Sequence, residues 1–398
     1  MEKLGLKQFS SILNYGLFVM VLTHTLTHSF QNIHTSLFPV LKTEFNLGYY
    51  ELGLIAAIPP LCQTILSIPA GMLSDKFGTK RMIIFSQILS CAGSLVAGFT
   101  QNPLMLIAAV SLLYLNTTFY HPPSYSYVTK TFSPSDRSKA LGIHGAGGTL
   151  GMALGPISIS IIMGFFGYQW RQVYLFWFIP LLIGLIFIFK IKADPELESK
   201  PKTKQEYSKQ PETKSVMSSS MLWFLVSNGI KTLASGMSTA FLSIYLVQSQ
   251  GWNIASASLI IGTSSLMGII AAPLGGFFAD KVGEKKWTVL TTTVCAISYG
   301  LAFIFPGVIL FSVFYLGYGF FTLLSMASNS SLTAKLSPTK QRGLGFALYF
   351  LPGSIMGVLA PMASAFIANT YGLQTVFFAA TAVFLLSVPI LQLGVKVD

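Results

Sequence analysis

Six basic titratable side chains lie inside long apolar segments of this chain, where such groups are rare. A titratable group at that depth is costly to bury, so its default interpretation is a functional site that faces water. Asp and Glu are absent from the middle of every apolar segment, so no acidic partner is expected beside these side chains. The six are His24, His28, His34, His121, His144 and Lys231.

His24 and His28 are four residues apart, which places them on one face of a helix, near the middle of the first apolar segment. Lys231 lies at almost the same depth in the seventh segment. Imidazole, with an ordinary pKa of about 6.5, exchanges protons near neutral pH, and an ammonium group attracts anions. We therefore predict that His28 or His24 is a proton site and that Lys231 binds an anion, whereas His34 and His144 are interpreted as packing residues.

His121 precedes Pro122 and Pro123, which remove helix hydrogen bonds and free carbonyl oxygens near a cavity. We expect this cavity to be lined by the first, fourth, seventh and tenth helices. A metal site is not predicted, because the histidines lack a carboxylate or thiolate partner. The candidate substrate or proton site consists of His24, His28, Asn32, Tyr120, His121, Asn228, Lys231 and Asn329.

The composition identifies an integral membrane protein. The chain has 398 residues, of which 52% are hydrophobic and 10% charged, whereas soluble domains carry about 25% charged residues. The net charge of +12 does not indicate a nucleic-acid partner, because the basic residues lie in short loops between apolar segments. A Walker-type loop and the spacings of hydrolase active sites are both absent, so neither ATP nor enzymatic activity is expected.

Twelve segments are long enough to span a membrane as helices, which requires about 20 mostly apolar residues. The sequence therefore predicts an all-α membrane protein of two pseudo-symmetric six-helix bundles, over 1–192 and 219–398, joined by a polar linker over 193–218. The predicted spans are 11–37, 49–73, 82–99, 103–129, 139–166, 171–191, 219–247, 254–279, 287–305, 308–334, 342–369 and 373–394.

The distribution of lysine and arginine predicts the orientation. If the N-terminus is cytoplasmic, all basic residues except Lys42, Arg171 and Lys231 fall at cytoplasmic helix ends or in cytoplasmic loops. This matches the positive-inside rule, and an even number of helices returns the C-terminus to the same side. We expect a multi-pass protein of the cell (inner or plasma) membrane with both termini in the cytoplasm.

An internal repeat relates the two halves. The stretch GMLSDKFGTKR (71–81) returns as GGFFADKVGEKK (275–286), and Asp75 and Asp280 are 205 residues apart, as are Gly78 and Gly283. We expect these two glycines to form tight turns, and Gly71 and Gly276 to let neighbouring helices approach closely. A repeat of this length predicts two similarly folded halves.

With two six-helix halves, a central linker and this duplicated loop, the whole chain resembles the major facilitator superfamily. Within it, YHPPSY (120–125) and ALGIHGAGGTLGMALGP (140–156) are similar to a prokaryotic group of fosmidomycin-resistance-type exporters. That group often has an acid where this chain has Asn32.

The resemblance implies a paired cytoplasmic gate, with Asp75 meeting the helix that begins near Arg342 and Asp280 meeting the one near Arg137. Each acid would favour the positive N-terminal end of its partner helix. The gate residues are Gly71, Asp75, Gly78, Arg81, Arg137, Gly276, Asp280, Gly283 and Arg342.

Glycines at four-residue spacing mark the fifth and eleventh helices, and they resemble the antiporter-type glycine motif of the family. We expect tight contact between the halves and local bending at the prolines. The residues are Gly151, Gly155 and Pro156, mirrored by Gly353, Gly357 and Pro361.

These features predict a monomeric secondary transporter that moves a small anionic or amphiphilic molecule by alternating access, without a cofactor. The preferred hypothesis is proton-coupled efflux with the proton gradient as energy source. Import or uniport of organic anions or small metabolites is an alternative, because gradients decide the direction of transport. A transition-metal carrier using His24, His28 and His121, and a non-transporting receptor, are further alternatives.

Overall fold

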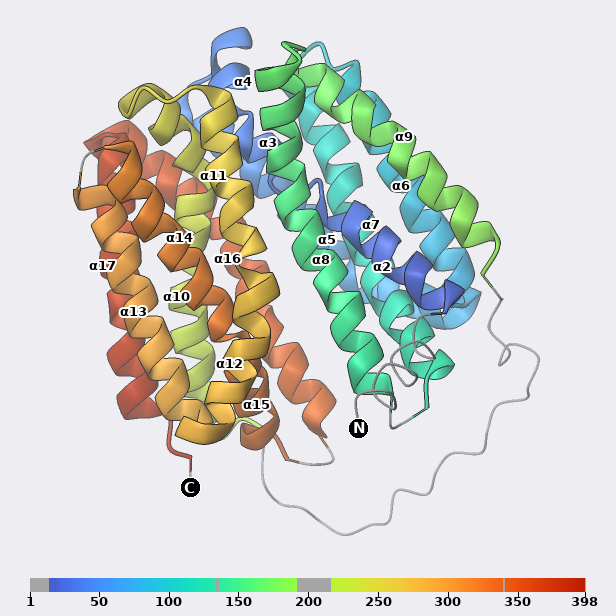
Figure 1. The fold of residues 1–398 in the computed structure, drawn as a ribbon, viewed down its shortest axis with the longest axis vertical. Helices are drawn as coiled ribbons and strands as arrows, with labels where there is room; N and C mark the ends of the chain where they lie inside the picture. Colours follow the sequence, from blue (N-terminus) through green and yellow to red (C-terminus); the bar gives the residue numbers. More distant parts are fainter. Residues whose placement is uncertain (1–13, 134–135, 192–215, 306, 339–340, 398) are drawn as a thin grey trace, which may run out of the picture. The chain divides into compact units, whose positions relative to one another are not determined.

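The structure is a computed structural model that describes residues 14–133, 136–191, 216–305, 307–338 and 341–397. Every regular element within these ranges is helical (Figure 1). Eleven of the described helices or helix pairs are long and apolar enough to cross a membrane, by length and composition. The predicted all-α membrane architecture is therefore confirmed.

Contacts between Cα atoms divide the chain into two compact units. The first contains residues 1–31, 62–155 and 168–212, as far as these are described. In this unit α6 packs against both α7 and α9, and α2 packs against α7 and α9. Its helices are α2 (Tyr15–His28), most of α5 (Tyr49–Phe77), α6 (Thr79–Gly98), α7 (Pro103–Thr131), most of α8 (Arg137–Ile159) and α9 (Trp170–Phe189).

The second unit contains residues 32–61, 156–167 and 213–398. In it α10 packs against α16 and α17, and α13 packs against α14 and α17. Its helices are α3 (Ile33–Ser36), α4 (Phe38–Glu44), η1 (Ser160–Phe165), α10 (Ser219–Ile244), η3 (Tyr245–Ser249), α11 (Ile254–Leu266), α12 (Gly268–Val282), α13 (Glu284–Ile304), α14 (Val308–Leu324), α15 (Met326–Leu336), α16 (Arg342–Tyr371) and α17 (Leu373–Gly394).

The border between these units crosses α5 after Leu61 and α8 after Gly155, just before the predicted bend at Pro156. Two segments from the first half of the sequence thus belong to the second unit. Ser243 of α10, for example, donates a hydrogen bond to the carbonyl oxygen of Thr35 at 2.5 Å. The predicted linker lies mostly outside the described residues, and the predicted domain boundaries stay a prediction.

The 205-residue repeat extends to the positions where helices begin. The starts of α5 and α11, of α6 and α13, of α7 and α14, and of α8 and α16 are all related by this offset. Gly78 and Gly283 immediately precede α6 and α13 and have φ angles of 81° and 92°. Because glycine adopts positive φ at low cost, both residues form the tight turn that the sequence predicts.

The first predicted helix, over 11–37, is not continuous. α2 ends at His28, and turns separate it from α3. Ser29 donates a hydrogen bond to the carbonyl oxygen of Thr25 at 2.8 Å, and His28 bonds to the side chain of Gln31. Such local bonds from polar side chains compete with the helical ladder, which explains why the helix stops beside the histidines.

Close helix approach in the repeated loop occurs one residue earlier than the motif suggests. A Cβ atom on Gly275 would overlap the backbone of Leu324, whereas one on Gly276 would lie 3.6 Å from Ala327, an ordinary contact. No described atom lies within 4 Å of the Cβ position at Gly71. Among the described residues the closely packed position is therefore Gly275 and not Gly276, and the repeat mate of Gly275 is the buried Ala70. The role of Gly71 stays a prediction.

The predicted gate is described only in part. Gly78 and Gly283 make the turns, and the side chains of Arg81 and Asp280 are exposed, whereas that of Arg137 is half-buried. The side chains of Asp75 and Arg342 lie outside the described residues. The gate therefore stays a prediction.

The glycine faces of α8 and α16 have different neighbours. Against the expectation of contact between the halves, Gly151 faces the backbone of Thr25 in α2 of its own unit, and Gly353 has no described atom within 4 Å of its Cβ position. Gly357 does face a residue of the first half, since its Cβ position is 3.4 Å from Pro60. Pro156 and Pro361 lie inside α8 and α16, as expected.

Candidate functional site

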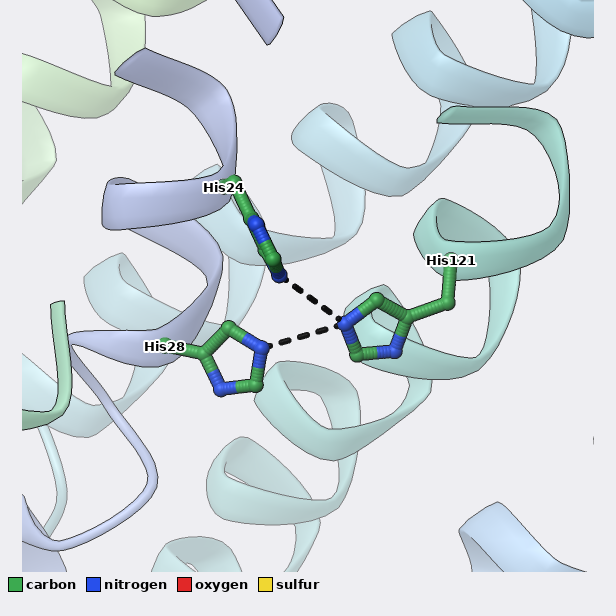
Figure 2. Close-up of side chains that lie close together, drawn as sticks. All are labelled: His24, His28 and His121. Carbon is green, nitrogen blue, oxygen red and sulfur yellow. Dashed lines mark hydrogen bonds between the residues drawn. The ribbon is translucent and has the colours of Figure 1, made fainter. Parts of the chain in front are cut away.

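Three of the predicted histidines converge on one point in the first unit. Figure 2 shows His24 and His28 of α2 directed at His121 of α7. The Nε2 atom of His121 lies 3.2 Å from Nε2 of His24 and 3.1 Å from Nε2 of His28. His24 is buried, and the other two rings are half-buried. The structure thus joins the α2 pair, which the sequence places on one face, to a third imidazole from another helix.

The outer nitrogens of the two α2 rings have fixed partners. Nδ1 of His24 lies 2.7 Å from the carbonyl oxygen of His144, and Nδ1 of His28 lies 2.9 Å from Oε1 of Gln31. Carbonyl and amide oxygens only accept hydrogen bonds, so both Nδ1 atoms donate. In the neutral rings the proton is on Nδ1, and each Nε2 carries a lone pair.

Two helix contacts hold the rings in place. The hydroxyl of Tyr120 donates a hydrogen bond to the carbonyl oxygen of Met20 at 2.8 Å and lies 2.9 Å from Oγ1 of Thr23, which ties α7 to α2 beside His121. Gly148 of α8 leaves space for His24, because a Cβ atom there would lie 2.8 Å from Cε1 of that ring. Tyr120 is predicted from the sequence to be a site residue. Its side chain is fully buried and joins α7 to α2.

His144, interpreted as a packing residue, is buried and stacks on His24 with ring centroids 4.2 Å apart and an interplanar angle of 18°. Its ring supports His24 from α8, and its carbonyl oxygen fixes the tautomer of His24. His34 is buried in α3, in the other unit.

Lys231 lies on a separate cavity of about 60 Å³ inside the second unit. The described lining comes from α10, α13, α14, Ser325 and α17. The seventh and tenth predicted helices therefore contribute to it, whereas the first and fourth do not, and the ninth and twelfth take part instead. Among the described residues the lining contains no carboxylate, and the ammonium group forms no hydrogen bond or ion pair. The residues around Lys231 are Thr232, Ser235, Thr292, Cys295, Tyr318, Thr322, Ser325 and Phe384.

One hydroxyl in this cavity has no partner. Thr292 is buried, and its Oγ1 forms no hydrogen bond within the described part of the chain. By contrast, Ser325 donates to the carbonyl oxygen of Thr322 at 2.8 Å, and Cys295 contacts Thr322 with its Sγ 3.0 Å from Oγ1. Lys231 therefore lines this small cavity together with Thr292, whose buried hydroxyl has no described partner, beside the junction of α14 and α15.

The remaining candidates lie elsewhere. Asn228 donates a hydrogen bond to the carbonyl oxygen of Tyr349 at 3.1 Å, and Asn329 donates to Oγ of Ser325 at 3.3 Å. Asn32 precedes α3 and belongs to the second unit. None of the three lines the Lys231 cavity or joins the histidine cluster.

Several residues at the histidine cluster and at the Lys231 cavity are not among those predicted from the sequence. Gln31 gives a signal, because a polar side chain three residues after His28 can reach back at a helix end. Thr292 and Cys295 give none, since a threonine or cysteine in an apolar span is ordinary. Gly148 is one of several neighbouring glycines, and only the packing of α8 against α2 distinguishes it.

Comparison with known proteins identifies the family. The family model of the Major Facilitator Superfamily matches residues 20–231 and 224–397, which is most of the chain. The chain belongs to the Major Facilitator Superfamily. Members of this superfamily are secondary transporters and not enzymes, so this chain is a multi-pass membrane protein that carries a small-molecule substrate.

Individual relatives of this superfamily member are distant. It is 24% identical to the fosmidomycin resistance protein of Escherichia coli, over 66% of this chain and 64% of that protein. It is 25% identical to the sialic acid transporter NanX of the same organism, over 87% and 85% of the two chains. A crystal structure of a bacterial homolog of the human lysosomal transporter Spinster has a TM-score of 0.79 at 16% identity, covering 96% of both chains. That structure supports the fold.

Proposed function

We propose that this superfamily member exports a small anionic or amphiphilic solute by alternating access, with Lys231 as the group that binds the anion. The observation that carries the proposal is the ammonium group of Lys231, which shares its cavity with the unpaired hydroxyl of Thr292 and with no described carboxylate. An ionised group at this depth is costly unless a counter-charge compensates it. An anion supplies that charge and accepts a hydrogen bond from the hydroxyl.

The size of the cavity limits what enters it. A cavity of about 60 Å³ holds only a few water molecules, since about 10–15 Å³ of such volume is enough for one. This volume suits a carboxylate or another small anionic group, with the rest of the solute outside the cavity. The proposed ligand is therefore a solute with a small anionic group. The cavity does not limit the size of the rest of the solute.

We propose the proton gradient as the energy source. Exchange of an outgoing monovalent anion for an incoming proton moves two unit charges down an inside-negative potential, worth about 4–5 kcal/mol per 100 mV. Cotransport of the same anion with a proton moves no net charge. Proton antiport thus supplies the larger driving force for efflux.

The remaining parts of the proposal follow from the sequence. Both termini face the cytoplasm, because nearly all lysines and arginines then lie on that side. The loops that turn at Gly78 and Gly283 form the cytoplasmic gate. The protein works as a monomer in the cell membrane, without a cofactor or nucleic acid.

A ligand screen by thermal shift on the purified protein tests the substrate class. Matched sets of anionic, neutral and cationic compounds are compared in wild type and in Lys231→Gln. We expect stabilisation by members of the anionic set and its loss in Lys231→Gln. Stabilisation by cations alone, or equal stabilisation of both proteins by anions, contradicts the proposal.

A further inference from the structure

We propose that His24, His28 and His121 form a binding site for a divalent transition metal such as Zn²⁺, with a fourth coordination position left open. The three ligand nitrogens lie within 4.8 Å of one another and come from two helices of one unit. The sequence predicts no metal site, because no carboxylate or thiolate accompanies these histidines, and it gives a transition-metal carrier only as an alternative. The proposed metal ligands are separate from the proposed anion-binding group, because Lys231 lies in the other unit.

Hydrogen bonding within the cluster leaves one lone pair without a donor, either that on Nε2 of His24 or that on Nε2 of His28. Nδ1 of His24 and Nδ1 of His28 both donate to oxygens, so both Nε2 atoms direct lone pairs at His121. One imidazole nitrogen carries either one proton or one lone pair. Nε2 of His121 can therefore donate to only one of its two neighbours at a time. A cation placed between the rings satisfies all three lone pairs together.

The spacing of the nitrogens matches a metal site. Zinc–nitrogen bonds of about 2.0–2.1 Å in a tetrahedron require nitrogens roughly 3.3 Å apart. The two separations from Nε2 of His121 are 3.2 and 3.1 Å. All three nitrogens lie within 4.8 Å of one another, so two separations already match and the rings of His24 and His28 need only adjust to complete the site.

Two of the ring N–H groups are already held by oxygen acceptors, as metal-binding histidines require. Such a histidine normally donates its other N–H to a carbonyl or carboxylate, which fixes the tautomer and the ring orientation. The carbonyl oxygen of His144 and Oε1 of Gln31 do this for His24 and His28 at 2.7 and 2.9 Å. The rings of His28 and His121 are only half-buried, so both ligands stay partly accessible.

The donor set selects the class of metal. Imidazole nitrogens suit Zn²⁺, Cu²⁺, Ni²⁺ and Fe²⁺, whereas Mg²⁺ and Ca²⁺ prefer oxygen ligands. No further ligand joins these three histidines among the described residues, which leaves one position for water or for an atom of another molecule. The site is therefore an open three-histidine centre and not a closed structural one.

Metal binding to the purified full-length chain tests the proposal. The protein is stripped with a chelator, and Zn²⁺ alone is titrated by calorimetry, while Co²⁺ is followed by the visible absorption of low-coordinate cobalt. We expect one saturable Zn²⁺ per chain, a rise in melting temperature and a Co²⁺ spectrum that Zn²⁺ displaces. Absence of saturable binding, or a spectrum of octahedral cobalt, overturns the proposal.

Four variants distinguish these ligands from other histidines. His28→Ala and His121→Ala should abolish the cobalt spectrum, whereas His34→Gln, outside the cluster, should bind as wild type does. Gln31→Leu keeps all three ligands but removes the acceptor of the His28 Nδ1 proton, which should weaken Zn²⁺ binding roughly 10- to 100-fold. Elution volume and metal-free melting temperature report folding. Wild-type affinity in His121→Ala, or equal loss in His34→Gln, contradicts the assignment.

Discussion

The Nε2 atoms of His28 and His121 lie 3.1 Å apart, although 93 residues separate them in the chain. The contact joins the end of α2, where the first helix is interrupted, to the middle of α7. Interrupted helices in membrane transporters commonly mark binding sites. The interruption and the histidine cluster therefore identify one site by two separate criteria.

Gly148 should be required for that cluster. Gly148→Ala places a Cβ atom 2.8 Å from Cε1 and 2.9 Å from Nε2 of His24, so the ring must move. We expect weaker Zn²⁺ binding and a loss of roughly 1–3 kcal/mol in stability from overpacking. The matched control is Gly353→Ala at the repeat mate, which has no described atom within 4 Å. Equal effects of the two substitutions on Zn²⁺ affinity would contradict the geometry.

The neighbouring glycines of the second repeated loop should respond differently to alanine. Gly275→Ala overlaps the backbone of Leu324, which cannot move as a side chain can, whereas Gly276→Ala makes an ordinary contact. We expect Gly275→Ala to destabilise the protein by at least about 1–3 kcal/mol more than Gly276→Ala. Melting temperatures of both variants in one detergent provide the comparison. A larger effect at Gly276 would show that the helix register is wrong.

The charge of Lys231, and not its bulk, should set anion affinity. Lys231→Gln removes the charge and should weaken binding of an anion from the screen roughly 10- to 100-fold, since a charged hydrogen bond contributes about 1.5–3 kcal/mol. Lys42→Gln is the matched control, because Lys42 lies over the ring of Tyr49 and away from the cavity. Affinity is measured by calorimetry. Unchanged affinity in Lys231→Gln would remove Lys231 from the site.

Much of the fold follows from the sequence because its signals are local. Apolar length predicts the spans, and the repeated loop predicts where paired helices begin, as the shared offset of Thr79 and Glu284 shows. The interruption after His28 is harder to predict, since it depends on polar side chains bonding within one turn.

The sites are predicted less completely, because packing decides them. Spacing alone pairs His24 with His28, but the position of His121 depends on how α7 meets α2 through Tyr120 and Met20. A motif also cannot tell Gly275 from Gly276, since one residue of helix rotation turns a side chain by about 100°. Lys231 is conspicuous in the sequence, whereas the unpaired hydroxyl of Thr292 is visible only in the structure.

The charge moved per transported anion tests the proposed function most directly. Reversal potentials are measured in proteoliposomes with a monovalent anion from the screen, a pH gradient and a potential set by potassium and valinomycin. Proton antiport predicts that two charges move per anion and that a potential drives transport even at equal pH. Both the current and the anion flux should be lost in Lys231→Gln. A potential-independent flux that follows only the pH gradient would contradict proton antiport and indicate electroneutral cotransport.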